Sequence, residues 1–500
     1  MFISRSSASH PDPTTLSAVP PDSADVDAPA VTDPGRPSHA DRVVALALVL
    51  VSAGATAAVI VRPRFTLGRA GALAVAFAAL GLALGVARWR RALGMRSVMI
   101  TTLALLVVAV AYWPRDSTDI WSYAAYGRMV SKYGESPYRH VPIEFSNDRA
   151  IRRVKPTWQN TSSVYGPLWT GISAGVVSVT QTHLQSTRIW FQALAALSVF
   201  LAVLLIARRT RAPAAAALVG LNPLIIYDIV NGGHNDALVG LALLAGVLLA
   251  TRDRFRWAAV AIALGALVKL VALLGLVALV VWIWRKRGIR AAATAAGIGS
   301  GVVALGYAFT GGLDALTPLR EARLQMSRNS IWLLSNAEGR TNLFGFGRVF
   351  DFSHQFVESV ATLSTITVLV LAGVLVAGRL RDSTPALVVG SAAVAYLLAG
   401  AYVLPWYAAW ALPVLALEWR TGLTRLVLAQ SALYLIAYQY RQGVPRSLPY
   451  RALFASNVVL VLFEVTIIAA LIFMVVRQCR PTRVRVEVAE PPKPVAAQVD

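Results

Sequence analysis

A succession of long apolar blocks constrains this fold more than any other feature of the sequence. Most of the blocks contain enough residues to cross a hydrocarbon core of about 30 Å as a helix. Hydrophobic residues make up 56% of the 500-residue chain and charged residues only 14%, with no strand-like alternation between the blocks. One soluble core cannot bury that much apolar surface. The sequence therefore predicts an all-α, polytopic membrane protein.

About fourteen transmembrane or partly spanning helices are expected, each corresponding to one apolar block. The pair of blocks around Lys269 and the pair meeting at Pro405-Trp406-Tyr407 include short members, which we expect to be tight hairpins or tilted half-helices. The helical domain is expected over 42–477, with blocks at 43–61, 70–86, 97–113, 188–207, 213–229, 236–250, 257–268, 271–284, 290–309, 355–377, 384–402, 405–418, 423–438 and 455–477.

Arginine-rich runs between alternate blocks predict the orientation, because cytoplasmic loops of membrane proteins are enriched in Arg and Lys. The rule predicts cytoplasmic termini, with a disordered tail at 1–41 and a basic tail at 478–500. Outward-facing loops are then expected at about 114–187, 310–354 and 439–454. Arg62, Arg64 and Arg69 break the pattern. The stretch 165–180 is expected to be a surface or partly re-entrant helix, since a full crossing would invert the next Arg cluster.

The net charge of +22 does not indicate nucleic acid as a partner, because topology accounts for most of the arginines. The expected surroundings are a lipid bilayer. No nucleotide-binding fold is expected, since the chain lacks a strand–helix alternation with a Gly-rich phosphate loop, and no cofactor is assigned. Its single cysteine, Cys479, excludes an internal disulfide and a cysteine-based metal site.

Asp116 and Asp119 open the longest polar loop, directly after an apolar block. A carboxylate at a lipid–water boundary beside Trp113, Trp121 and Tyr123 can have its basicity raised enough to act as a general base. The alternative is that Asp119 caps a helix beginning at the next residue.

Two aromatic turn segments follow in the same loop, one ending at Tyr138 and one containing Tyr165 and Trp169. Aromatic rings beside hydroxyl and amide groups can hold a sugar by stacking and hydrogen bonding. An interfacial aromatic belt is the alternative.

The connection 231–236 (Asn-Gly-Gly-His-Asn-Asp) places His234 and Asp236 between two apolar blocks, where polar groups are costly unless used. Alternatively, this is a solvated turn in which Asp236 caps the next helix. A metal site from these two residues has no further His or Cys cluster to support it. Lys269, alone between two short apolar helices, suggests a contact with a phosphate, or else a lysine that snorkels to the interface.

Together these motifs resemble the membrane-embedded GT-C glycosyltransferases, and in particular the actinobacterial polyprenyl-phosphomannose-dependent α-1,6-mannosyltransferases of lipomannan and lipoarabinomannan assembly. The resemblance covers about residues 97–420. It depends on Asp119-Ile120-Trp121-Ser122-Tyr123, Gly134 to Tyr138, Tyr165 to Trp169, Asn231 to Asp236, and Pro405-Trp406-Tyr407.

The resemblance implies a GT-C-like bundle with outward-facing catalytic loops in the bacterial inner membrane. It further implies an inverting transfer of mannose from a polyprenyl phosphate donor to a cell-envelope glycolipid acceptor. Asp119 matches the family's catalytic aspartate, with Asp116 as the second candidate. Substrate contacts are expected from Tyr123, Tyr138, Tyr165, Trp169, His234, Asp236, Lys269 and Trp406, and no metal is assigned. The alternatives are a glycolipid transporter or flippase, which broken helices would also suit, and a non-catalytic partner of an envelope assembly complex.

Overall fold

The computed structural model describes residues 37–62, 66–325, 327, 330, 332, 354–380 and 384–443. Every regular element in these ranges is helical, which confirms the predicted all-α class. Six described helical segments, including Pro213–Val230 with its internal break, are long and apolar enough to cross a membrane, and shorter apolar helices accompany them. Of the tail predicted at 1–41, residues 1–36 lie outside the described residues and residues 39–41 belong to the first helix. The tail predicted at 478–500 and the helix predicted at 455–477 also lie outside them.

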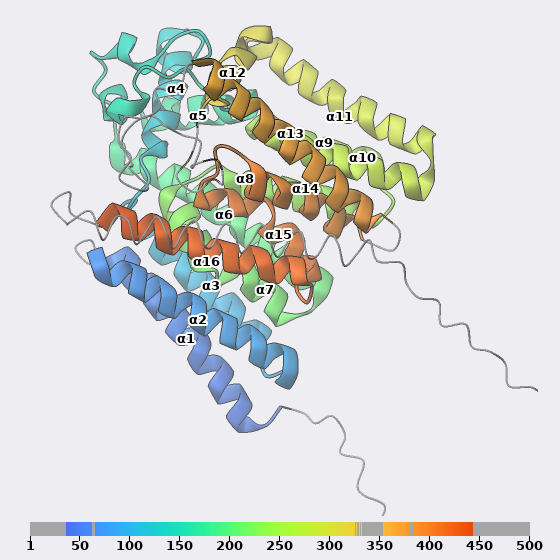
Figure 1. Ribbon diagram of the computed structural model, residues 1–500. Helices are drawn as coiled ribbons and strands as arrows, with labels where there is room; N and C mark the ends of the chain where they lie inside the picture. The colour runs from blue at the N-terminus through green and yellow to red at the C-terminus, as the bar shows by residue number, and fades with distance from the viewer. Residues whose placement is uncertain are drawn as a thin grey trace, which may run out of the picture.

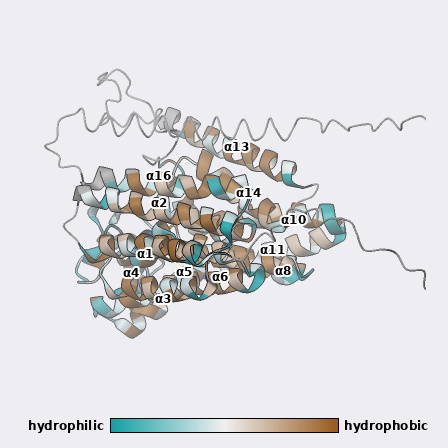
Figure 2. Cartoon of the chain, turned by 90° about the horizontal axis from the view of Figure 1, so that it is seen from below, coloured by the Kyte–Doolittle hydropathy of each residue, from teal (hydrophilic) through white to brown (hydrophobic). Residues whose placement is uncertain are grey.

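The helices pack side by side as a bundle (Figure 1), and hydrophobic residues, coloured brown, recur along the helices (Figure 2). The first helix begins at His39, four residues earlier than its apolar block, because Ser38 and Asp41 form a reciprocal cap around its first turn. The bundle consists of α1 (His39–Val61), α2 (Thr66–Arg90), α3 (Met95–Ala111), α6 (Leu184–Thr210), α7 (Pro213–Gly220), α8 (Asp236–Ala250), α9 (Phe255–Val268), α10 (Leu273–Arg287), α11 (Ile289–Thr310), α13 (His354–Arg379), α14 (Pro385–Ala399) and α16 (Gly422–Gly443).

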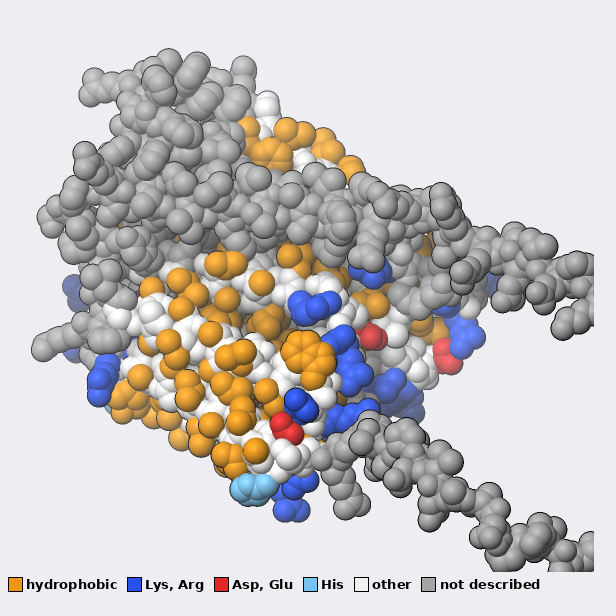
Figure 3. Space-filling model, turned by 60° about the horizontal axis from the view of Figure 1, so that its bottom comes forward, with side chains coloured by type: hydrophobic (Ala, Val, Ile, Leu, Met, Phe, Trp, Pro, Cys, Tyr) orange, Lys and Arg blue, Asp and Glu red, His pale blue; other side chains and the backbone are white. Residues whose placement is uncertain are grey.

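Arg-rich helix ends gather at one end of this bundle. Two ion pairs link the ends there: Arg90 pairs with Asp41 at the start of α1, and Arg287 of α10 pairs with Asp253 between α8 and α9. On the face shown in Figure 3, Lys and Arg side chains collect along one edge, beside a broad apolar surface. This distribution is the one that the positive-inside rule associates with a cytoplasmic end.

The opposite end carries the segment that follows α3, including α4 (Asp119–Tyr133) and α5 (Pro167–Thr180) (Figure 1). The short turns η1 (Pro142–Phe145), η2 (Ile151–Arg153) and η3 (Pro156–Trp158) join α4 to α5. The helix expected within 165–180 is therefore present. Further along the chain, η6 (Gly312–Leu316) and α12 (Thr317–Ala322) follow α11.

The last carbonyl groups of α3 have no partners within their own helix and receive them from side chains of other elements. Arg188 donates to the carbonyls of Val110 and Tyr112 at 2.7 and 3.0 Å. Asn231 donates to the carbonyls of Ala109 and Tyr112 at 2.9 and 3.1 Å. These bonds fix the end of α3, and with it the start of the loop that carries both aspartates.

Two predicted helices are interrupted in the structure. The block 213–229 is not one helix: α7 ends before Asn222-Pro223, and a wide π-helical segment, η4 (Leu224–Val230), follows. Proline removes a backbone donor and clashes with the preceding turn, which explains the break. The block 405–418 comprises the short pieces η8 (Pro405–Trp410), α15 (Leu412–Leu415) and η9 (Ala416–Glu418). The break at Lys269 is as predicted, with η5 (Leu270–Ala272) between α9 and α10.

Candidate active site

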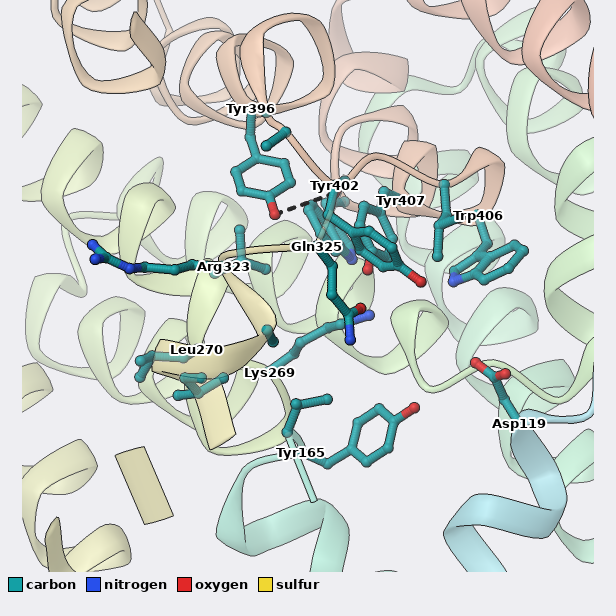
Figure 4. A pocket seen from close by; sticks show the side chains of 18 of the residues that line it. Asp119, Tyr165, Lys269, Leu270, Arg323, Gln325, Tyr396, Tyr402, Trp406 and Tyr407 are labelled. Carbon is teal, nitrogen blue, oxygen red and sulfur yellow. Dashed lines mark hydrogen bonds between the residues drawn. The ribbon is translucent and has the colours of Figure 1, made fainter. Parts of the chain in front are cut away.

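A cavity of about 640 Å³ lies at the end of the bundle that carries α4 (Figure 4). Its walls come from the α3–α4 connection, the loop before α5, η5 with α10, α12 with the residues after it, α13, and the η8 region. Five of the ten predicted site residues line it: Asp116, Asp119, Tyr165, Lys269 and Trp406. Tyr123, Tyr138, Trp169, His234 and Asp236 are buried outside the lining.

Asp119 is the first residue of α4, and its side chain is 26% exposed, toward the cavity. The cap position belongs to Thr118, and Asp119 donates its backbone N–H to the Ser117 hydroxyl at 3.2 Å. The capping interpretation of Asp119 is therefore wrong, since its carboxylate makes no capping bond. That carboxylate instead lies 3.4 Å from Nδ1 of His234.

Electrostatic forces on Asp119 oppose each other. Burial alone would raise the pKa of the carboxyl, but the contact with His234 and the positive charges of Lys269 and Lys155 hold the pKa below its usual value. The carboxylate is therefore ionised at neutral pH. An ionised carboxylate that faces a cavity can accept a proton from a bound hydroxyl group.

Asp116 also lines the cavity but is held by three separate elements. Arg69 of α2 forms an ion pair with it at 3.0 Å, and Tyr227 of η4 and Gln439 of α16 both donate hydrogen bonds to it. Arg69 was one of the arginines that broke the topology pattern, and this ion pair accounts for its position at the α4 end. With its oxygens already engaged, Asp116 is less available for catalysis than Asp119 and instead ties the bundle together.

Lys269 lies in an extended backbone conformation between α9 and η5. The expectation of an isolated ammonium is wrong: Nζ lies 2.9 Å from Oδ1 of Asp236 and over the rings of Tyr407 and Trp410. The capping role considered for Asp236 is not observed, because its Oδ1 binds Lys269 and accepts a hydrogen bond from the Trp410 indole at 2.7 Å. An ammonium has three donors, and Lys269 remains 15% exposed beside the cavity.

Three of the predicted aromatic residues, Tyr123, Tyr165 and Trp169, form a cluster with Phe191 of α6 beside the cavity. Tyr123 meets Tyr165, Trp169 and Phe191 edge-on, with ring centroids 4.9, 5.0 and 5.6 Å apart. Burial, with the charge of Asp119 adding to it, raises the pKa of the Tyr123 hydroxyl. Of these four rings, only Tyr165 reaches the cavity.

The turn before α5 is fixed against the break at Lys269. The Gly166 N–H donates to the Val268 carbonyl at 3.0 Å, and a Cβ at Gly166 would lie 2.2 Å from the Leu267 carbonyl oxygen. Only glycine allows that approach. The Tyr138 hydroxyl also holds this turn, by donating a hydrogen bond to the Tyr165 carbonyl at 3.1 Å.

Some cavity residues were not singled out from the sequence. Lys155 comes from the loop before α5, and Tyr402 and Tyr438 lie far along the chain. No local pattern distinguishes them, because only tertiary packing brings them to Asp119. Arg323 also lines the cavity, and in Figure 4 it lies on the far side of Lys269 from Asp119.

The fold and the cavity define a class. This is a multi-pass helical membrane protein with an ionised carboxylate, cations and aromatic rings around a cavity at one end of its bundle. Among the described residues, no group of three or more His, Cys, Asp and Glu side chains is arranged to hold a metal ion.

Comparison with known proteins gives the family. Residues 38–286 match the family model described as "Alpha-(1->6)-mannopyranosyltransferase, N-terminal domain". This region of the chain is therefore similar to the alpha-(1->6)-mannopyranosyltransferase family, in agreement with the resemblance of its motifs. No solved structure matches the chain.

Relatives with the same name include proteins of two actinobacteria. The chain is 26% identical over 344 residues to alpha-(1->6)-mannopyranosyltransferase A of Mycobacterium tuberculosis, covering 64% of each protein. It is 28% identical over 188 residues to alpha-(1->6)-mannopyranosyltransferase A of Corynebacterium glutamicum, covering 37% of this chain and 38% of that protein. The matched regions thus span less than two thirds of the length of either relative.

Proposed function

We propose that the chain is an inverting mannosyltransferase of the bacterial inner membrane that uses a polyprenyl phosphate donor and a glycolipid acceptor. The observation that carries this proposal is Asp119: an ionised carboxylate, partly exposed, on the wall of a 640 Å³ cavity, in the half of the chain that matches the mannosyltransferase family.

Asp119 would act as the general base. It accepts the proton of an acceptor hydroxyl while that oxygen attacks the anomeric carbon of the donor sugar. The bond from the anomeric carbon to the phosphate oxygen breaks at the same time, so the configuration inverts and lipid phosphate leaves. Cations facing the cavity stabilise the charge on this leaving group. Lys269 and Lys155 both line the cavity, and their charges act on Asp119.

The composition of the cavity supports a lipid-linked donor. Its wall at α10 and α13 is apolar, with Leu274, Val277, Val368 and Leu369 among the lining residues. Val277 is 62% exposed and Leu369 is 56% exposed on the outside of the bundle. A prenyl chain can therefore lie between α10 and α13, in contact with the bilayer, while its phosphate and sugar occupy the polar end near Asp119.

The proposal also includes the side of the membrane that the cavity faces. With the Arg-rich end of the bundle in the cytoplasm, both termini are cytoplasmic and the cavity faces outward, within the outer loops at 114–187 and 310–354. Neither the described residues nor the relatives give specific support to the transport alternative.

The test is reconstitution of the purified chain in liposomes with polyprenyl-phosphomannose and an envelope glycolipid acceptor, with mass spectrometry of the products. We expect one added hexose per acceptor, and a much slower reaction when polyprenyl-phosphoglucose replaces the donor. Movement of the lipid across the bilayer without any sugar transfer would contradict the proposal and indicate a transporter.

A further inference from the structure

His234 does not line the cavity, but it contacts two residues that do, Asp119 and Trp406. Its side chain is completely buried. One face of the imidazole stacks on Trp406, with ring centroids 4.2 Å apart and planes 21° apart, and Nδ1 lies 3.4 Å from the Asp119 carboxylate. A buried ring in this position cannot contact the substrate directly, which is the role that the family resemblance implied for it.

The glycine-rich connection before α8 is shaped around this ring. A Cβ at Gly232 would lie 2.7 Å from Cδ2 of His234, so any larger residue there would displace the imidazole. Gly233 has φ +67°, which favours glycine, and its Cβ would lie 2.8 Å from Ile120, the neighbour of Asp119. The backbone N–H of His234 donates to the Ile229 carbonyl at 2.9 Å. The connection therefore holds the imidazole in one place against the first turn of α4.

Charged groups surround the imidazole from each element packed against it. Carboxylates come from Asp119 of α4, Asp228 of η4 and Asp236 of α8, and Lys269 is the nearby cation that pairs with Asp236. Burial alone would lower the pKa of His234, but the three carboxylates, Asp119 foremost, raise it. The imidazolium form is favoured, which in turn keeps Asp119 in its ionised form.

We propose that His234 is a positioning residue that keeps the Asp119 carboxylate ionised and directed into the cavity, with Trp406 fixing the imidazole from the other side. One ring thereby couples an aromatic wall of the cavity to the carboxylate. The effect of His234 on the charge of Asp119 holds whether or not Asp119 is the catalytic base. Its effect on the reaction rate depends on the proposed function.

His234→Gln removes the charge and keeps a polar side chain of similar size. The measurement is carbodiimide labelling of Asp119 in the full-length protein in nanodiscs, followed by peptide mass spectrometry as a function of pH, since only the protonated carboxyl reacts. We expect the labelling midpoint to move to higher pH in the variant. At a pH below both labelling midpoints, each pH unit of this shift corresponds to about a tenfold smaller ionised fraction of Asp119.

His140→Gln is the matched control. His140 lies in the same outer segment, paired with Glu144 at 2.6 Å, and it is absent from the charges that act on Asp119. The control should label like the wild type. Gly232→Ala keeps the histidine but displaces the ring, so it should shift the midpoint in the same direction as His234→Gln by a smaller amount, and it tests the proposal if His234→Gln does not fold.

An unchanged midpoint in folded His234→Gln or Gly232→Ala would overturn the proposal and leave His234 a packing residue. The pH profile of sugar transfer should repeat the shift on its acid side, whereas a merely structural role would lower the rate equally at every pH. Because labelling does not require turnover, a failed transfer assay with a shifted midpoint would reject the proposed function but not the coupling.

Discussion

Replacing Lys269 with methionine should destabilise the protein through the carboxylate that it leaves behind. Asp236 has a side chain only 1% exposed and has Lys269 as its ion-pair partner at 2.9 Å. Removing one member of a buried ion pair costs about 3–5 kcal/mol, because the other charge stays buried without compensation. The Trp410 indole still donates to Asp236, so we expect a loss near the lower limit, about 3 kcal/mol.

A double-mutant cycle separates this effect from substrate binding. Asp236→Asn alone should cost less than Lys269→Met, because Lys269 is 15% exposed and can reach water through the cavity. The double variant, which removes both charges of this ion pair, should recover most of the stability. The measurement is the free energy of unfolding in mixed detergent micelles with increasing dodecyl sulfate.

Donor affinity is then compared between the wild type and the stable double variant. A loss of affinity for the lipid donor, with acceptor affinity kept, would assign Lys269 to the phosphate. Equal stability of Lys269→Met and the wild type would refute the electrostatic reasoning, since it would mean that Asp236 needs no cation.

Three further predictions concern the outer segment. Asp148→Asn should destabilise this segment, because it breaks the buried Arg128–Asp148 ion pair of 2.6 Å. Burial alone would raise the pKa of Asp148, but the hydrogen bonds from Arg128 and Lys132 outweigh it and lower the pKa. The wild type therefore keeps this stabilisation above the usual aspartate pKa and loses it as the pH falls further, and limited proteolysis at a series of pH values would show the loss. Gly166→Ala should reduce the rate of sugar transfer more than it reduces expression, because the added Cβ would push the turn away from the Leu267 carbonyl. A variant that transfers sugar at the wild-type rate would show that the position of this turn does not matter. A cysteine at Ser146, which is exposed, should react with a membrane-impermeant thiol reagent in intact cells, and reaction only after lysis would invert the proposed topology.

The positions of the helices could be predicted because hydropathy is local. A block of apolar residues of spanning length is sufficient evidence for a helix in a membrane, and the break at Lys269 followed from the shortness of its neighbours. The break before η4 was missed although Asn222-Pro223 marks it, because the apolar pattern continues through it. Hydropathy measures whether a segment is apolar, and it does not measure where the backbone hydrogen bonds end.

The contacts of the site residues could not be predicted, because they join distant parts of the chain. Asp116 binds Gln439, 323 residues away, and Asp236 binds Trp410, 174 residues away. The sequence correctly marked 231–236 as unusual for a simple turn, yet gave no means of seeing that His234 would be buried behind Asp119. Single-sequence patterns identify polar residues that are costly in a membrane, and only packing shows which partner offsets that cost.

The most direct test of Asp119 as the general base is a comparison of Asp119→Asn and Asp116→Asn in the reconstituted transfer assay. Asparagine keeps the size of the side chain but cannot take the acceptor proton, so Asp119→Asn should insert and fold while transfer falls by about 10²–10⁴-fold. Asp116→Asn should mainly reduce stability, because it weakens the ion pair with Arg69. Near-normal transfer by Asp119→Asn, with or without a loss in Asp116→Asn, would contradict the assignment of Asp119 as the base.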